Sequence, residues 1–283
     1  MHLFFSAEMT GSPSRPIGVF DSGVGGLSIV RELRRQMPAE SILYFADQDH
    51  VPYGPRPMEQ VRAFSEGITR FLLDHGADLI VVACNTASAA ALKQLRGGFP
   101  GVRFVGMEPA VKPAAEVTRS GIVGVLATPA TFQGELYASV VERFGQGVRL
   151  INQTVPGLVE QIEAGHLDTP ETERLIRRAL DPILQAGADT IVLACTHYPF
   201  VIPGISRLAG PAVNVIDPSP AIARQAARLR EAAPAYDPSE RGSLVLVTSG
   251  DPAALTGLSF RLTGERVEAS RARWHGSSLV LSP

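Results

Sequence analysis

Short apolar runs alternate along the chain with stretches in which apolar residues recur at helical spacing. The runs occupy residues 17–20, 42–45, 79–83, 104–105, 122–126, 190–194, 213–216 and 244–247. Between the first two runs, Leu27, Val30, Leu33 and Met37 would lie on one face of a helix, which Pro38 should end. Strands that alternate with helices in this way are typical of α/β proteins with mainly parallel sheets. We therefore predict an α/β fold.

The segment before each of the two cysteines has almost the same sequence in both places. Residues 76–84 read GADLIVVAC, and residues 187–195 read GADTIVLAC. The run IGVF at 17–20 is likewise echoed by VGVL at 123–126. Repetition of this extent indicates two similar lobes. Ligands bind beyond the carboxyl ends of the strands in open α/β sheets, so we expect an active site in the cleft between two pseudo-symmetric open lobes.

The length of 283 residues allows two lobes of moderate size, each with its own core. We assign residues 1–106 together with 218–283 to a discontinuous first lobe, and residues 107–217 to the second lobe. The pattern from about residue 218 onward predicts one more helix and one more strand, which we expect to complete the first lobe.

The composition is that of an ordinary globular protein, with 45% hydrophobic and 19% charged residues. A net charge of −2 with scattered Lys and Arg argues against nucleic-acid binding. The apolar runs are far too short to span a bilayer, and residues 1–16 lack the features of a signal peptide. Two cysteines without a CxxC motif fit a reducing compartment. We expect a cytoplasmic protein with two free thiols and with neither a membrane nor a nucleic-acid partner.

Each cysteine ends a predicted strand and leads into polar residues. Asn85 and Thr86 follow Cys84, while Thr196 and His197 follow Cys195. We expect Asn85 or Thr86 to cap a helix, so that each thiol faces a helix N-terminus, where free amides and positive potential favour the thiolate. A lone cysteine is more often a small buried core residue. Because polar residues follow both cysteines in the same way, we favour a catalytic role for both thiols, in equivalent settings.

Two thiols suit one class of reaction, the inversion of a carbon centre. Inversion removes a proton from one face of the carbon and delivers another to the opposite face, so two acid–base groups must flank the substrate. Two similar lobes, each with a cysteine at a strand end, supply that geometry. With an ordinary pKa of about 8.5, one cysteine can be a thiolate while the other is a thiol near neutral pH.

A glycine-rich segment, DSGVGG at 21–26, follows the first predicted strand and opens the first helix, where backbone amides can bind a carboxylate or a phosphate. A dinucleotide site is disfavoured there, because Ser28 stands where that motif needs its third glycine and Asp21 would repel a pyrophosphate. Asp21 and Ser22 are about equally well explained as helix-capping residues.

Tyr53 and Gly54 lie in a proline-rich loop, which is atypical of a helix or a central strand. His197 either tunes the neighbouring thiol, helps to bind an anion, or is an ordinary buried histidine, and its proximity to Cys195 favours a functional role. The other histidines show no metal-ligand spacing, so we predict no metal site.

Four segments combine into a specific pattern: GVFDSGVGGL at 18–27, PYG at 52–54, ACNTA at 83–87 and ACTHYP at 194–199. Together they closely resemble the glutamate racemases, within the wider aspartate/glutamate racemase superfamily. The resemblance implies an isomerase that interconverts L-glutamate and D-glutamate without pyridoxal phosphate, metal or any other cofactor. It also implies a bacterial cytoplasmic enzyme, usually a homodimer, which supplies D-glutamate for peptidoglycan synthesis and hence for cell-wall biogenesis and cell shape.

By the same resemblance, Cys84 and Cys195 are the proton donor and acceptor, and Glu163 is an auxiliary acid. Asp21 and His197 are implied as partners of the thiols or of the substrate ammonium group. The implied substrate-binding residues are Asp21, Ser22, Tyr53, Gly54, Asn85, Thr86, Thr128, Thr131, Thr196 and His197. Hydrogen-bond donors among them have to stabilise the α-carbanion, since no cofactor does so.

Three other functions stay open at this point. A racemase for aspartate or another amino acid would keep the thiol pair and change the carboxylate pocket. A noncatalytic binding protein would keep the fold alone. A thiol redox protein would form a disulfide between Cys84 and Cys195 under mild oxidation.

Overall fold

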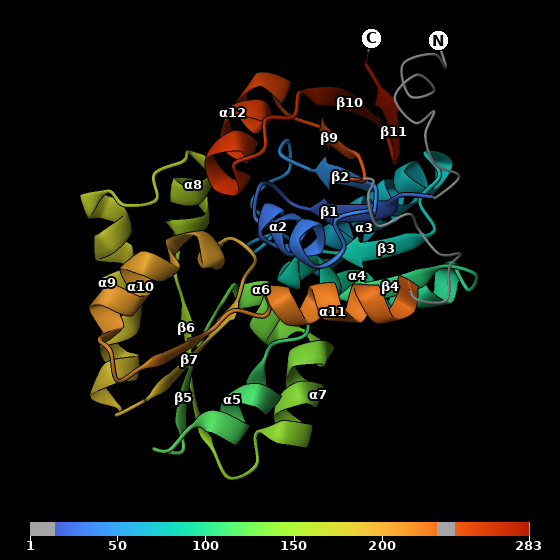
Figure 1. The fold of residues 1–283 in the computed structure, drawn as a ribbon. Helices are drawn as coiled ribbons and strands as arrows, with labels where there is room; N and C mark the ends of the chain where they lie inside the picture. The colour runs from blue at the N-terminus through green and yellow to red at the C-terminus, as the bar shows by residue number, and fades with distance from the viewer. Residues whose placement is uncertain (1–14, 231–240, 283) are drawn as a thin grey trace.

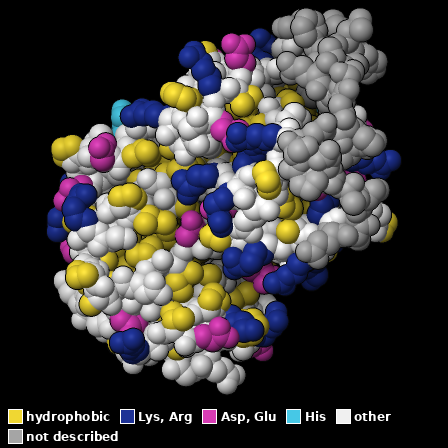
Figure 2. Space-filling model, in the orientation of Figure 1, with side chains coloured by type: hydrophobic (Ala, Val, Ile, Leu, Met, Phe, Trp, Pro, Cys, Tyr) yellow, Lys and Arg dark blue, Asp and Glu magenta, His cyan; other side chains and the backbone are white. Residues whose placement is uncertain are grey.

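The computed structural model describes residues 15–230 and 241–282, so the expectation for residues 1–16 falls largely outside the described part. Two sheets, each with helices on both faces, form two lobes that lie side by side (Figure 1). Figure 2 shows Lys and Arg interspersed with acidic and apolar side chains on the visible face. No helix in the described ranges is long and apolar enough to cross a membrane.

The first sheet draws its strands from both ends of the chain. Across the described residues its order is β11 (Ser278–Leu281), β10 (Ala269–His275), β9 (Leu244–Thr248), β2 (Ile42–Ala46), β1 (Ile17–Asp21), β3 (Leu79–Val82) and β4 (Arg103–Gly106). The second sheet has the order β6 (Arg149–Thr154), β5 (Ile122–Ala127), β7 (Thr190–Ala194) and β8 (Asn214–Ile216). Neighbouring strands are parallel except for the antiparallel pair β10 and β11. The predicted α/β fold with mainly parallel sheets is confirmed.

The two sheets repeat one arrangement of strands. The order β2, β1, β3, β4 in the first sheet matches the order β6, β5, β7, β8 in the second. The strand β3 ends just before Cys84, and its counterpart β7 ends just before Cys195. The two thiols therefore occupy equivalent places in the backbones of two similar lobes.

Helices cover both faces of each sheet (Figure 1). On the first sheet, one face carries α2 (Leu27–Gln36), α11 (Ser219–Arg230) and α12 (Pro252–Thr263), and the other carries α3 (Met58–Asp74) and α4 (Asn85–Gly98). On the second sheet, one face carries α8 (Leu158–Glu163), α9 (Pro170–Gln185), the 3₁₀ helix η1 (Tyr198–Val201) and α10 (Ile202–Ala209), and the other carries α5 (Val111–Val117), α6 (Pro129–Gln133) and α7 (Glu135–Phe144). The helix α2 ends before Pro38, as its apolar spacing predicts.

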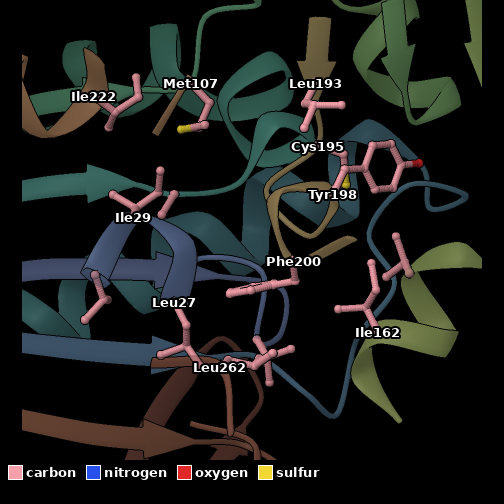
Figure 3. Packing of buried hydrophobic residues seen from close by; sticks show 14 of the residues in the cluster. Leu27, Ile29, Met107, Ile162, Leu193, Cys195, Tyr198, Phe200, Ile222 and Leu262 are labelled. Carbon is pink, nitrogen blue, oxygen red and sulfur yellow. The ribbon is translucent and has the colours of Figure 1, made fainter. Parts of the chain in front are cut away.

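One apolar cluster continues from the first lobe into the second (Figure 3). Leu27 and Ile29 of α2 belong to it, together with Cys195, Tyr198 and Phe200 from the segment that follows β7. Burial of apolar surface is the main favourable term in folding, so this shared cluster holds the two lobes together beside their strand ends.

The sequence pattern missed three strands. The segment after residue 218 contains, within its described part, two helices and the strands β9, β10 and β11, so the prediction of one more helix and one more strand is wrong. Residues of β10 and β11 alternate between exposed and more buried positions, and β6 is a polar edge strand, so none of the three has a continuous apolar run. The strands β9 to β11 extend the first sheet. The lobe boundaries at residues 106 and 217 stay a prediction.

A buried carboxylate connects the C-terminal strands to the rest of the first lobe. Asp47 has no exposed surface, and its Oδ1 accepts hydrogen bonds from Trp274 Nε1 at 2.8 Å and from Ser249 Oγ at 2.9 Å. Tyr53 donates to Oδ2 at 2.6 Å. A segment distant in the sequence thereby supports the loop that contains Tyr53.

Replacing Trp274 with phenylalanine is expected to lower the free energy of unfolding by about 1–3 kcal/mol, because the buried carboxylate of Asp47 loses one donor. Urea denaturation measures the change. Arg273→Ala, at an exposed position of the same strand, is the control and should change stability by less than about 0.5 kcal/mol. Equal losses in the two variants would show that the indole hydrogen bond contributes nothing specific.

Candidate active site

A cavity of about 280 Å³ lies at the carboxyl ends of strands from both lobes. Its lining residues are Ser22, Pro52, Tyr53, Gly54, Cys84, Asn85, Thr86, Thr128, Val159, Cys195, Thr196 and His197. The remaining residues of the predicted site, Asp21, Thr131 and Glu163, lie behind this lining and are hydrogen-bonded to it. All of the predicted site residues therefore come together at one place. Pro52 and Val159 were not among the predicted site residues. Val159 was missed because an apolar residue on an amphipathic helix has the same pattern as a core residue.

Cys84 is itself the N-cap residue of α4. Its Sγ accepts a hydrogen bond from the Ala87 amide at 3.4 Å, so the expectation that Asn85 or Thr86 caps this helix is wrong. A thiol with extended backbone at the N-cap reaches the free amides that a capping hydroxyl would otherwise bind. The helix N-terminus thus acts on the thiol directly, as expected.

Asp21 lies fully buried at the end of β1, beside Cys84. Its Oδ1 accepts the Ser22 amide at 2.7 Å, and its Oδ2 accepts the Gly26 amide at 2.5 Å and the Thr196 hydroxyl at 3.2 Å. Burial raises the pKa of the Asp21 carboxyl above its ordinary value, and this outweighs the charge of His197 and the hydrogen bond from Cys84. Asp21 is therefore a hydrogen-bond acceptor for the Cys84 thiol.

The protonated form of Cys84 is favoured. Burial raises the pKa of the Cys84 thiol well above its ordinary value, and the negative charge of Asp21 acts in the same direction. The Ala87 amide lowers the pKa but does not offset these two effects. The helix N-terminus alone would favour the thiolate, so the structure reverses that expectation at this cysteine.

Alkylation should report this raised pKa. The chain has two cysteines, so Cys195→Ser leaves Cys84 as the sole thiol. Iodoacetamide reacts with the thiolate, so the labelling rate should still rise about tenfold per pH unit at pH 9, above the ordinary cysteine pKa of about 8.5. Mass spectrometry follows the reaction, with the urea-unfolded protein as the reference.

Asp21→Asn in the same background is the matched variant. Loss of the carboxylate charge should lower the pKa of Cys84 and increase labelling at any fixed pH, since the thiolate is no longer repelled. A labelling rate in the folded protein that reaches a plateau near pH 8.5, with no response to Asp21→Asn, would contradict the assignment.

Cys195 has a cationic neighbour instead. Its Sγ lies 3.9 Å from His197 Nδ1, and His197 Nε2 lies 2.6 Å from Glu163 Oε1. Burial alone would lower the pKa of His197, but the hydrogen bonds to Cys195 and Glu163 raise it well above its ordinary value. The two thiols therefore have different chemical settings, which corrects the expectation of equivalent ones.

Glu163 carries the negative charge among the side chains next to Cys195. Burial would raise the pKa of its carboxyl, but the hydrogen bond and charge of His197, with donors from Val24 and Gln48, lower it below its ordinary value. Val24 N donates to Oε1 at 2.7 Å, and Gln48 Nε2 donates to Oε2 at 3.2 Å. His197 and Glu163 form a buried ion pair beside Cys195.

Unpaired and mutually paired polar groups line the rest of the cavity. Both polar atoms of the Asn85 side chain are buried without a partner among the described residues. A chain of hydroxyls crosses between the lobes, from Thr86 to Thr128 at 2.8 Å and from Thr128 to Thr131 at 2.9 Å. A buried amide without partners is costly, so Asn85 is a candidate for a hydrogen bond to a bound ligand.

The Tyr53 hydroxyl does not face the cavity as a free donor. It donates a hydrogen bond to Asp47. The cavity wall at residues 53–54 is therefore formed by the tyrosine ring and the backbone. A Cβ on Gly54 would lie 3.0 Å from the Thr128 side chain, so the absence of a side chain permits this close approach. The described residues contain no group of three His, Cys, Asp or Glu side chains arranged to hold a metal ion.

The chain is similar in sequence and in fold to several glutamate racemases. The model of the Asp/Glu/Hydantoin racemase family matches residues 17–226. A glutamate racemase from Roseiflexus sp. is 49% identical over 264 residues, which cover 90% of this chain and 94% of the relative.

Solved structures agree with the sequence comparison. A glutamate racemase isoform from Bacillus anthracis has a TM-score of 0.85 and 29% identity, and the match covers 94% of this chain and 100% of the other. The enzyme from Francisella tularensis, solved in complex with D-glutamate, has a TM-score of 0.80 and 26% identity, with coverage of 92% and 97%. The chain belongs to the Asp/Glu/Hydantoin racemase family.

Proposed function

We propose that this protein interconverts L-glutamate and D-glutamate by proton transfer between the substrate α-carbon and two thiols, Cys84 and Cys195, on opposite faces. The observation that carries the proposal is that the two cysteines stand at equivalent strand ends of two similar lobes and line one cavity.

Each turnover moves two protons. The thiolate on one face takes the α-proton, and the bonding electrons stay on the α-carbon and its carboxylate. The thiol on the opposite face then donates its proton to the same carbon, so the configuration inverts and the two cysteines exchange protonation states. Exchange of thiol protons with solvent restores the starting state.

The two faces have different supporting groups. Asp21 accepts a hydrogen bond from the Cys84 thiol, while the His197 imidazolium places positive charge beside the Cys195 sulfur and is held by Glu163. Positive charge next to a thiolate stabilises it. Asp21, His197 and Glu163 are therefore assigned as partners of the two proton-transfer groups.

Hydrogen-bond donors around the cavity bind the substrate and its transition state. Asn85 presents an unpartnered amide and Thr86 presents a hydroxyl, whereas the hydroxyls of Ser22 and Thr196 donate to Asp21. Donors fixed in place before the reaction stabilise the charge that develops on the substrate carboxylate as the α-proton leaves. The proposed reaction uses these residues and requires no cofactor.

The deciding experiment incubates the protein with L-glutamate in deuterated water, with a chelator and no added pyridoxal phosphate. The proposal predicts that D-glutamate forms and that deuterium appears at the α-carbon. Chiral chromatography measures the first, and NMR measures the second. Conversion of aspartate but not glutamate would keep the chemistry and change the substrate. Absence of exchange with every amino acid tested, by a folded sample, would favour a binding protein.

The biological setting follows from the same resemblance. We infer a cytoplasmic homodimer that supplies D-glutamate for peptidoglycan synthesis. Light scattering coupled to size-exclusion chromatography tests the dimer: a mass near twice 30.1 kDa supports it, and a mass of a single chain contradicts it.

A further inference from the structure

A line of hydrogen bonds runs from the first lobe to the Cys195 face of the cavity. Thr248 Oγ1 donates to Gln48 Oε1 at 2.9 Å, and Gln48 Nε2 donates to Glu163 Oε2 at 3.2 Å. The other oxygen of Glu163 lies 2.6 Å from His197, which contacts Cys195. Gln48 and Thr248 do not line the cavity and belong to none of the motifs that indicated the function.

The direction of these hydrogen bonds is set by the Glu163 carboxylate, which only accepts, and Thr248 satisfies the opposite end of the Gln48 amide. Thr248 Oγ1 accepts the Gly250 N–H at 2.9 Å, and the Thr248 side chain is fully buried. Its hydroxyl hydrogen is therefore free to point at Gln48 Oε1, which turns the Nε2 donor of Gln48 toward Glu163. The threonine thus stabilises the orientation in which the Nε2 donor of Gln48 faces the carboxylate.

Glu163 depends on this donor for one of its two oxygens. Oε1 is shared by the Val24 amide and His197, whereas the hydrogen bond that the described residues make to Oε2 comes from Gln48. We infer that Gln48, oriented by Thr248, is a positioning residue that holds Glu163 against His197 and so supports proton transfer at Cys195. This inference rests on the proposed two-thiol racemisation.

The contact also links the lobes, because Gln48 follows β2 of the first sheet and Glu163 ends α8 of the second. Titratable groups face the ion pair from both sides. They are Asp21 and Tyr44 from the first lobe, and Cys195 from the second. Substitution at position 48 leaves all of them in place, so its effect acts through Glu163.

The test compares wild type with Gln48→Met, which keeps the side-chain length and removes the amide. Loss of one hydrogen bond to a buried charge should lower kcat/KM by about tenfold. L-glutamate and D-glutamate have equal free energies, so kcat/KM must stay equal in the two directions for every variant, which controls the assay. The informative readout is the isotope effect of α-deuterated substrate, measured from each enantiomer.

A defect confined to the Cys195 step changes the two isotope effects in opposite directions. The effect grows for the enantiomer that Cys195 deprotonates, because that step becomes more rate-limiting, and it shrinks for the other enantiomer. A second readout is the pH profile. The hydrogen bond from Gln48 lowers the pKa of the Glu163 carboxyl, so its loss should raise that pKa and move the acid limb of kcat/KM to higher pH.

Thr248 supplies a matched pair of variants that leaves Gln48 itself unchanged. Thr248→Val removes the hydroxyl that orients the amide and should reproduce the divergent isotope effects in weaker form. Thr248→Ser retains the hydroxyl and should behave like wild type. This pair decides the question if Gln48→Met does not fold.

Two results would overturn the inference. One is unchanged kinetics in Gln48→Met and Thr248→Val. The other is a loss of rate with unchanged isotope effects and an unchanged pH profile, which indicates a general structural role. In both cases the wild-type protein still racemises glutamate, so the proposed function stands. If the wild-type protein itself showed no α-deuterium exchange, the proposed function would be wrong.

Discussion

Replacing either Cys84 or Cys195 with alanine is expected to lower kcat for glutamate racemisation by about 10²–10⁴-fold, the range typical of losing one general acid or base. Both thiols lie against the same cavity, and inversion requires a proton carrier on each face of the α-carbon. One remaining thiol cannot complete the transfer. Polarimetry with each enantiomer as substrate measures the loss.

The two alanine variants should differ in a second measurement, α-deuterium exchange without inversion. The thiol left in each variant can still remove and return a proton on its own face, so each variant should exchange one enantiomer slowly and leave the other unchanged. The enantiomer should switch between Cys84→Ala and Cys195→Ala. Exchange of the same enantiomer by both variants would contradict an arrangement on opposite faces.

A folding control accompanies these variants. Cysteine and alanine are both small, and each thiol is about 5% exposed, so the change removes little packing volume. Circular dichroism and the urea midpoint should stay close to wild type. If a cysteine variant lost its structure as well as its activity, the catalytic role of the thiols would be tested with Asp21→Asn instead. That variant keeps both thiols and changes the charge beside Cys84.

Much of the fold could be predicted because parallel strands are buried on both faces. The strand β7 spans Thr190–Ala194, the same residues as the predicted run, and all five are buried. A continuous apolar run is the direct result of that burial. The strand β6, RLINQT, lies at an edge of its sheet with no buried residue, so its sequence carries no such signal.

The two cysteines could be predicted because their surroundings are repeated in one chain, and the repetition survives as equivalent strand positions. Their different partners could not be predicted. Glu163 lies 34 residues from His197 and 115 residues from Gln48 in the sequence, so these contacts exist through the packing of α8 against the first lobe. A local sequence pattern describes a strand and the residues that follow it. It carries no information about which distant side chain contacts those residues.

The second large expected effect concerns a buried ion cluster at the opposite ends of the same strands. Arg230, the last residue of α11, is 6% exposed, and its Nε lies 2.9 and 3.0 Å from the two carboxylate oxygens of Glu40. Its Nη1 also donates to Asp78, which immediately precedes β3. The cavity lies at the carboxyl end of β3, so this cluster affects stability without touching the site.

Arg230→Met should lower the free energy of unfolding by about 3–5 kcal/mol, since it removes the positive charge that lies against the buried carboxylate of Glu40. The methionine keeps most of the apolar stem, which limits the packing change. Urea denaturation measures the loss, and kcat and KM of the folded variant at low temperature should stay near wild type.

Arg228→Met provides the matched control on the same helix. Arg228 is exposed, and a surface substitution of this kind should change the free energy of unfolding by no more than about 0.5 kcal/mol. The difference between the two variants therefore isolates the buried ion pairs from helix propensity and from the loss of one arginine charge. Similar losses in both would mean that the cluster contributes little. A fall in kcat with unchanged stability for Arg230→Met would mean that α11 influences the cavity through the sheet, which the geometry does not predict.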